Sequence, residues 1–177
     1  MRLIAFAACP LLAFGLVGAV APAQASTSAA ASCTPLLKKA KKSARAGQKA
    51  KAKRLRNKHR ACKGALTVRT ALAGYTFTGK RGDGQAVTLT LCSNGTWESR
   101  TGNGPVAVSS GTSWFVRNTT FSSATKWETQ VGENKDRRKG GWGVGMARDG
   151  DSFQLGIASF DGVSDLGPVT RTPAACG

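Results

Sequence analysis

The spacing of apolar residues changes once along this chain. Before about residue 64, apolar positions such as Leu36, Ala40 and Ala44 recur every fourth residue, which is typical of helices. From Leu72 onward the period becomes two, and residues 87–91 alternate strictly between aliphatic side chains and threonine. The pattern predicts a helical segment followed by one globular domain of β-strands.

The helical segment is expected to form a hairpin of two short helices. The Thr34-Pro35 pair suits an N-cap and a first turn, so we expect a first helix from there to about residue 46. Gly47 can adopt the left-handed conformation that ends a helix, and a second helix is expected over residues 48–61, finishing before Gly64. Most facing positions are alanine, so the two helices can approach closely but bury little apolar area.

Two turn signals define hairpins in the strand region. Ser93-Asn94-Gly95 and Asp149-Gly150 each separate two alternating segments and predict tight reversals. With a first strand near residues 75–78 and a last near 168–171, we expect about eight short strands and a closed or nearly closed barrel. The fold class is therefore mainly β, a small antiparallel β-barrel preceded by a disulfide-stapled basic helical hairpin. The tryptophans expected to fill its core are Trp97, Trp114, Trp127 and Trp142.

Positive charge is concentrated in the helical segment. Between Cys33 and Cys62 the chain carries twelve Lys or Arg side chains, one His and no acid. Residues 33–64 hold thirteen basic residues, whereas the chain after residue 64 has twelve basic against nine acidic ones. The predicted hairpin therefore supplies nearly all the positive field of a chain whose formal net charge is +17.

A dense cationic surface of this kind suits anionic polymers, whose phosphates or carboxylates it can neutralise. We expect a non-enzymatic protein that binds a cell-wall polyanion, an anionic lipid surface or nucleic acid through the hairpin. Sequence-specific nucleic-acid recognition is not expected, since the run has no aromatic residue and only one asparagine. The residues expected to carry the binding are Lys38, Lys39, Lys41, Lys42, Lys49, Lys51, Lys53, Arg54, Arg56, Lys58 and Arg60.

Three other interpretations of these segments stay open from the sequence. The barrel could carry a small apolar ligand, with the hairpin serving as a wall anchor. The hairpin could be a solubilising spacer only. It could also be a solvated, partly disordered basic tail whose cysteines bond elsewhere.

Residues 1–25 are typical of a cleaved secretory signal. Arg2 precedes an apolar stretch from Leu3 to Val20, and residues 23–25 have the small-x-small pattern of a signal-peptidase site. The apolar stretch is near the lower length limit of a membrane-spanning helix, but we favour cleavage. The mature chain is then expected to begin near Ser26, to lack a transmembrane anchor and to be secreted, with cell-wall association through its charge.

Four cysteines follow the leader, and an even number in an exported protein predicts two disulfides in an oxidising compartment. No CxxC or HxxxH element occurs, and His59 is the only histidine, so neither a metal nor another cofactor is expected. Four cysteines allow three pairings. We favour Cys33 with Cys62 and Cys92 with Cys176, because each compositional segment then holds one bridge.

No combination of residues indicates a catalyst. A Ser-His-Asp site would have to join His59 in the hairpin to residues of the barrel. The acidic pairs Asp149 with Asp151 and Asp161 with Asp165 lie in turn-like segments, where carboxylates commonly serve turn formation. The chain is therefore not expected to be an enzyme.

Residues 72–77, 91–97 and 111–116 resemble, in order, the opening strands of small lipocalin-like, or calycin-like, secreted bacterial domains. The resemblance covers residues 70–177 and implies an up-and-down barrel with a ligand cavity and with Cys176 tied to the barrel. Gly74-Tyr75 stands where lipocalins have a Gly-x-Trp motif. The hairpin over residues 33–64 also looks like appendages of exported actinobacterial proteins, a likeness that implies no activity.

Overall fold

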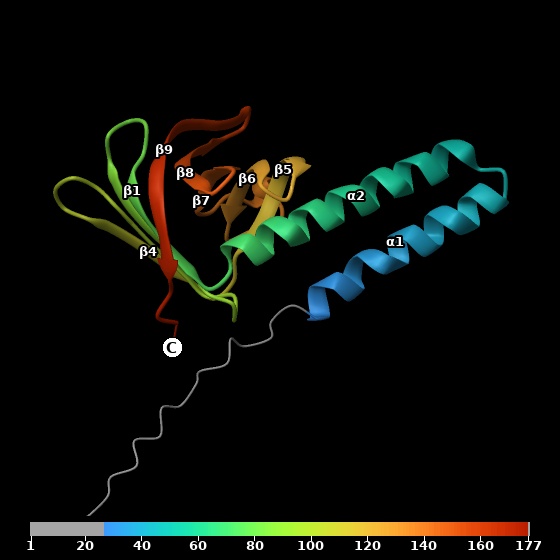
Figure 1. Ribbon diagram of the computed structural model, residues 1–177, viewed down its shortest axis with the longest axis horizontal. Helices are drawn as coiled ribbons and strands as arrows, with labels where there is room; N and C mark the ends of the chain where they lie inside the picture. The colour runs from blue at the N-terminus through green and yellow to red at the C-terminus, as the bar shows by residue number, and fades with distance from the viewer. Residues whose placement is uncertain (1–26, 177) are drawn as a thin grey trace, which may run out of the picture.

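The computed structural model describes residues 27–176, which form a two-helix hairpin and a nine-stranded antiparallel sheet (Figure 1). The predicted leader over residues 1–25 lies outside the described residues. The helices are α1 (Thr27–Arg45) and α2 (Lys49–Leu72). The strands are β1 (Tyr75–Lys80), β2 (Ala86–Leu91), β3 (Trp97–Thr101), β4 (Ala107–Gly111), β5 (Phe115–Ser123), β6 (Lys126–Gly132), β7 (Gly143–Asp149), β8 (Ser152–Ser159) and β9 (Gly162–Pro173), with a 3₁₀ turn η1 (Arg137–Lys139) between β6 and β7.

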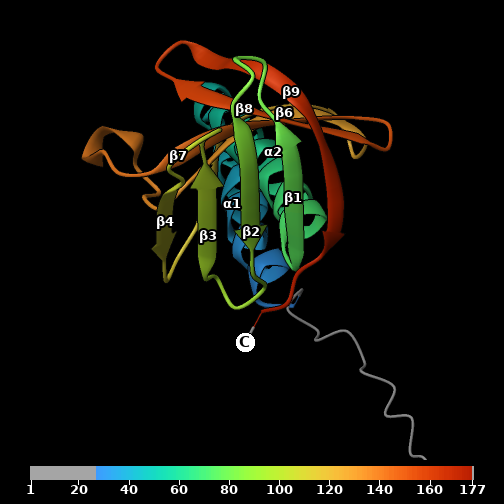
Figure 2. The same cartoon turned by 90° about the vertical axis from the view of Figure 1, so that its left-hand side faces the viewer.

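The sheet has the strand order β4-β3-β2-β1-β9-β8-β7-β6-β5. Consecutive strands pair from β1 to β4 and from β5 to β9. The last strand, β9, also pairs antiparallel with the first, β1, and so joins the two sets. The sheet curls into a half-barrel (Figure 2). This confirms the mainly β fold class, with a helical hairpin that precedes the strands in the sequence.

Closure of the barrel is incomplete, contrary to the expectation of a closed or nearly closed one. The nine strands within residues 27–176 agree with the expected count of about eight. The two edges of the sheet are β4 and β5. The register of β5 shifts between Arg117 and Thr120, where Asn118 has a φ of 49°. Because a bulge bends its strand and α2 packs against β5, this edge meets the helix instead of β4.

Both predicted tight reversals are confirmed. In the first, Gly95 has a φ of 101°, and the Thr96 amide donates to Oδ1 of Asn94 at 2.9 Å. In the second, Asp149 pairs with Ser152 across a turn in which Gly150 has a φ of 61°. A positive φ strains any residue with a Cβ, so the two glycines fix these turns.

Tryptophans belong to the hydrophobic core of the half-barrel, as expected. Trp97, Trp114 and Trp127 are buried, and the partly buried Trp142 stacks on Trp97 with ring centroids 3.9 Å apart. Trp97 belongs to β3 and Trp142 directly precedes β7, so this stacked pair joins the two walls of the curled sheet.

The predicted start of the first helix is wrong. It begins at Thr27 rather than at the Thr34-Pro35 pair, and Pro35 lies inside it. The preceding residues are rich in alanine, the strongest helix former, so the helix extends upstream despite the backbone hydrogen bond that a proline cannot donate.

The predicted end of the second helix is also wrong, since α2 continues to Leu72. Gly64, Val68 and Leu72 follow one another at fourth-residue spacing and are all buried. A Cβ on Gly64 would lie 3.1 Å from Cγ of Phe121 in β5, so this glycine allows the helix and the strand to approach closely. The last turns of α2 therefore belong to the core of the half-barrel.

Gly47 ends α1 as predicted, with a φ of 72° and with the Gln48 amide donating to the Ser43 carbonyl at 2.9 Å. Replacing Gly47 with alanine is expected to destabilise the hairpin by about 1 kcal/mol, because a Cβ is strained at this φ. Hydrogen exchange of the α1 amides measures the change. Gly84→Ala, at a φ of 81° in the β1–β2 loop, is the matched control and should leave these amides unchanged. If the α1 amides exchange at the same rate in both variants, Gly47 does not stabilise the end of α1.

Candidate functional site

The hairpin is held together by a disulfide near its open end. Cys33 of α1 and Cys62 of α2 are bonded, with their Cα atoms 5.8 Å apart, and Cys92 is bonded to Cys176. Both favoured pairings are thus confirmed. Two disulfides indicate an oxidising compartment.

Small side chains line the contact between α1 and α2. Ala40 is fully buried, and Ala52 and Ser43 are buried beside it. Such residues permit a close approach of the helices and leave no room between them for long side chains. The lysines and arginines must therefore point outward.

All eleven residues predicted to bind a polyanion are exposed to solvent on the hairpin. Arg45 and Lys63 are exposed on the same two helices and extend this set, although the residue pattern did not single them out. We call the exposed lysines and arginines of α1 and α2 between Lys38 and Lys63 the basic hairpin surface.

The charge of the basic hairpin surface is not compensated locally. Within the described part of the chain, none of its side chains forms an ion pair, and the contact of Arg60 is to a neutral group, Oδ1 of Asn57 at 3.2 Å. The first acidic residue of the chain is Asp83, beyond both helices. The hairpin extends away from the sheet (Figure 1), so its positive field faces solvent.

Several carboxylates of the half-barrel form ion pairs with nearby basic side chains, namely those of Asp83, Glu98, Asp136, Asp149 and Asp151. Asp149 pairs with Lys126 at 3.2 Å, and a hydrogen bond from Arg81 holds the pKa of Asp83 below its ordinary value. Over residues 27–176, no group of three or more His, Cys, Asp or Glu side chains is arranged to hold a metal ion.

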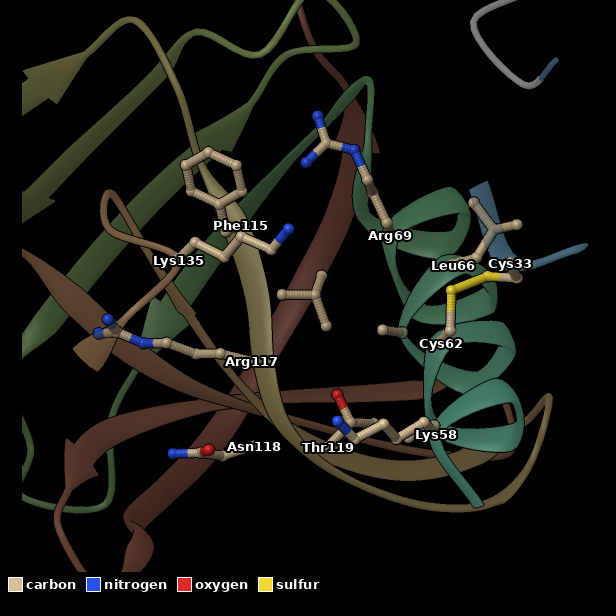
Figure 3. Close-up of a pocket in the computed structure, with 13 residues that line it drawn as sticks. Cys33, Lys58, Cys62, Leu66, Arg69, Phe115, Arg117, Asn118, Thr119 and Lys135 are labelled. Atoms are coloured by element: carbon tan, nitrogen blue, oxygen red, sulfur yellow. A yellow bond between two sulfur atoms is a disulfide. The ribbon is translucent and has the colours of Figure 1, made fainter. Parts of the chain in front are cut away.

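A second cationic feature was not predicted. A groove of about 550 Å³ lies between α2 and β5, beside the Cys33–Cys62 bridge (Figure 3). Among the described residues that line this α2–β5 groove, four are basic, Lys58, Arg69, Arg117 and Lys135, and none is a carboxylate. Of these four, the sequence pattern had identified Lys58 alone. The sequence carries one signal for the position of Arg69. Gly64, Val68 and Leu72 continue the helical spacing of apolar or small residues, which could have placed Arg69 on a helix near the sheet.

Within residues 27–176, no helix combines the length and the apolar character needed to cross a membrane. In comparisons with known proteins, no family model, no curated protein and no solved structure matches the chain.

Proposed function

We propose that this protein is secreted, is not an enzyme, and binds anionic extracellular polymers through the basic hairpin surface. One observation carries the proposal: the eleven predicted cations are all exposed, and none has an acidic partner within the described part of the chain. Their exposure on two bridged helices favours a fixed array of charges over a solvated tail.

Binding would draw its free energy from the release of counterions. A polyanion that lies against the two helices exchanges its condensed cations for lysine and arginine side chains, and each exchange makes the affinity fall with salt. At 1.5 Å per residue, the α2 segment from Lys49 to Lys63 extends its charges over about 20 Å. Such an array responds to the charge density of its ligand. Cell-wall polymers, anionic membranes and nucleic acid would therefore all bind by neutralisation of their anionic groups.

The contents of the half-barrel favour this function over carriage of a small apolar ligand inside a lipocalin-like barrel. Phe77, Leu89, Met146 and Leu155 are fully buried in the core, together with most of the tryptophan side chains. A ligand in that position would have to displace close-packed side chains, and the dispersion attraction among those side chains would be given up.

The experiment measures affinity for a labelled DNA duplex, a polyanion of known charge density, as a function of salt. In the test variant, Lys38, Lys39, Lys41 and Lys42 become glutamine, which preserves helix propensity. Removing four contacts should lower the slope of log affinity against log salt by about 3 to 4 and weaken binding at least about tenfold at low salt.

A matched control removes the same amount of charge from the half-barrel, by glutamine at the exposed residues Lys80, Arg100, Lys126 and Lys139. Its affinity should change much less than that of the hairpin variant. If the two variants lose affinity equally, net charge and not the basic hairpin surface accounts for the binding. If the affinity of the wild-type protein for DNA does not depend on salt, the hairpin is a spacer and not a polyanion-binding surface.

A further inference from the structure

The α2–β5 groove combines an apolar floor with cations at both ends. On the α2 side the floor is formed by Ala61, Ala65 and Leu66 with the Cys33–Cys62 bridge, and on the β5 side by Phe115 and Val116. Most of these side chains are half-buried and so keep apolar surface in contact with water. Covering that surface with a hydrocarbon chain is favourable in proportion to the area removed from water.

One end of the groove is the better place for an anion. Figure 3 shows Lys135 extended across the groove toward α2, with the guanidinium of Arg69 at the same end. Arg69 is held in place because its Nη1 donates to the Trp114 carbonyl at 2.7 Å and its guanidinium lies 4.1 Å from the centroid of the Trp114 ring. Burial lowers the pKa of Arg69, but an arginine stays cationic at neutral pH and has further N–H donors.

The other two cations of the groove, Arg117 and Lys58, lie away from this end or point away from it. Arg117 donates from Nη1 to the Asn134 carbonyl at 2.9 Å, which directs its guanidinium away from α2 and leaves its stem on the β5 side (Figure 3). Lys58 reaches from α2 toward Thr119 at the far end of the groove (Figure 3). The pair Arg69 and Lys135 is therefore the binding point for one anionic group, with the apolar floor leading away from it.

We propose that the α2–β5 groove binds a single-chain amphiphile with an anionic head, such as an alkyl phosphate. The head group contacts Lys135 and Arg69, and the alkyl chain lies along Leu66 and the Cys33–Cys62 bridge. The described lining residues include four cations and no carboxylate, which suits an anionic head group. The groove volume of about 550 Å³ falls within the range of small-ligand sites. This site uses a different surface from the polymer binding proposed above and shares with it one residue, Lys58.

Isothermal titration of the full mature protein with decyl phosphate, below its critical micelle concentration, tests the proposal. One molecule should bind per chain. Inorganic phosphate has the head without the chain, and decyl maltoside has the chain without the charge, so each should bind at least about tenfold more weakly. Across hexyl, octyl and decyl phosphate the affinity should rise about two- to fourfold per methylene group.

Two pairs of variants place the binding in the groove. Lys135→Ala should weaken decyl phosphate binding about tenfold, whereas Lys139→Ala, an exposed lysine outside the lining, should not. Ala61→Trp should fill the groove and abolish binding, whereas Ala50→Trp, at an exposed position of α2 outside the lining, should not. Circular dichroism of each variant verifies that the fold is retained.

Three results would overturn the proposal: equal binding of decyl maltoside, equal weakening by the two lysine variants, or binding unaffected by Ala61→Trp. The variant with glutamine at the four α1 lysines separates this site from the polymer-binding surface, since it should keep its affinity for decyl phosphate. If that variant loses decyl phosphate binding in parallel with DNA binding, the amphiphile binds the hairpin charges and not the groove.

Discussion

A variant in which Cys33 and Cys62 are both replaced by serine is expected to lose the helical structure of α1 while its sheet stays folded. The bridge spans a sequence separation of 29 residues, and in the chain-entropy model a loop of this size gives roughly 3 to 4 kcal/mol of stabilisation. Little else holds α1 in place, because over residues 33–45 its buried positions other than Cys33 are the small residues Ala40 and Ser43, and its closely spaced lysines repel one another. Far-UV circular dichroism measures the loss of helix, and hydrogen exchange locates it.

The second half of α2 should stay protected in this variant, since Val68 and Leu72 are anchored in the core. The control is the other bridge. Replacing Cys92 and Cys176 with serine opens a separation of 84 residues, and it should destabilise the sheet while α1 keeps its protection. If the α1 amides exchange as slowly without Cys33 and Cys62 as with them, the packing of small residues is sufficient and the expectation is wrong.

Loss of the hairpin bridge should affect the two proposed sites differently. Cys33 and Cys62 line the α2–β5 groove, so a bound amphiphile would have less apolar surface to cover. The number of cations on the hairpin is unchanged, so the salt slope of polymer binding should be preserved. The same variant therefore distinguishes a shaped site from an array of charges.

Replacing Trp114 with alanine is expected to lower the free energy of unfolding by about 3 to 5 kcal/mol, the range for a large aromatic residue in a core. Its side chain is 1% exposed, its Nε1 donates to the Cys92 carbonyl at 3.0 Å, and Arg69 packs over its ring. Trp114 thus connects the β2–β3 turn, α2 and the start of β5. Urea denaturation followed by far-UV circular dichroism measures the change.

Two substitutions calibrate the Trp114 result. Trp114→Phe keeps much of the ring volume, and the Cys92 carbonyl it releases still accepts a hydrogen bond from the Gly95 amide at 3.1 Å, so a smaller loss of about 1 to 2 kcal/mol is expected. Phe160→Ala, at a side chain that is 81% exposed, should change stability by less than about 0.5 kcal/mol. A Trp114→Ala cost as small as that of Phe160→Ala would refute the central role of this residue.

Local features of the chain were sufficient to predict much of the fold. Gly47, Gly95 and Gly150 were identified as turn residues because left-handed backbone conformations favour glycine wherever they occur. The two disulfides followed from the division of the chain into a basic and a mixed segment. The exposure of the eleven cations followed from the cost of burying an unpaired charge, which applies in any fold.

The remaining features depended on contacts between residues far apart in the sequence. From the sequence alone, Gly64 is expected to follow the end of a helix. In the structure α2 continues through Gly64, because Phe121 of β5 packs closely against this glycine. The sheet stays open between β4 and β5 because α2 lies against the bulged edge, an outcome that no strand pattern encodes.

The basic character of the hairpin was thus determined by the sequence alone, since charge is a property of each residue. The α2–β5 groove was decided by the tertiary structure, which brings Arg69 of a helix and Lys135 of a loop to one end of an apolar floor. A site of that kind consists of distances between side chains, and packing of the whole chain sets those distances.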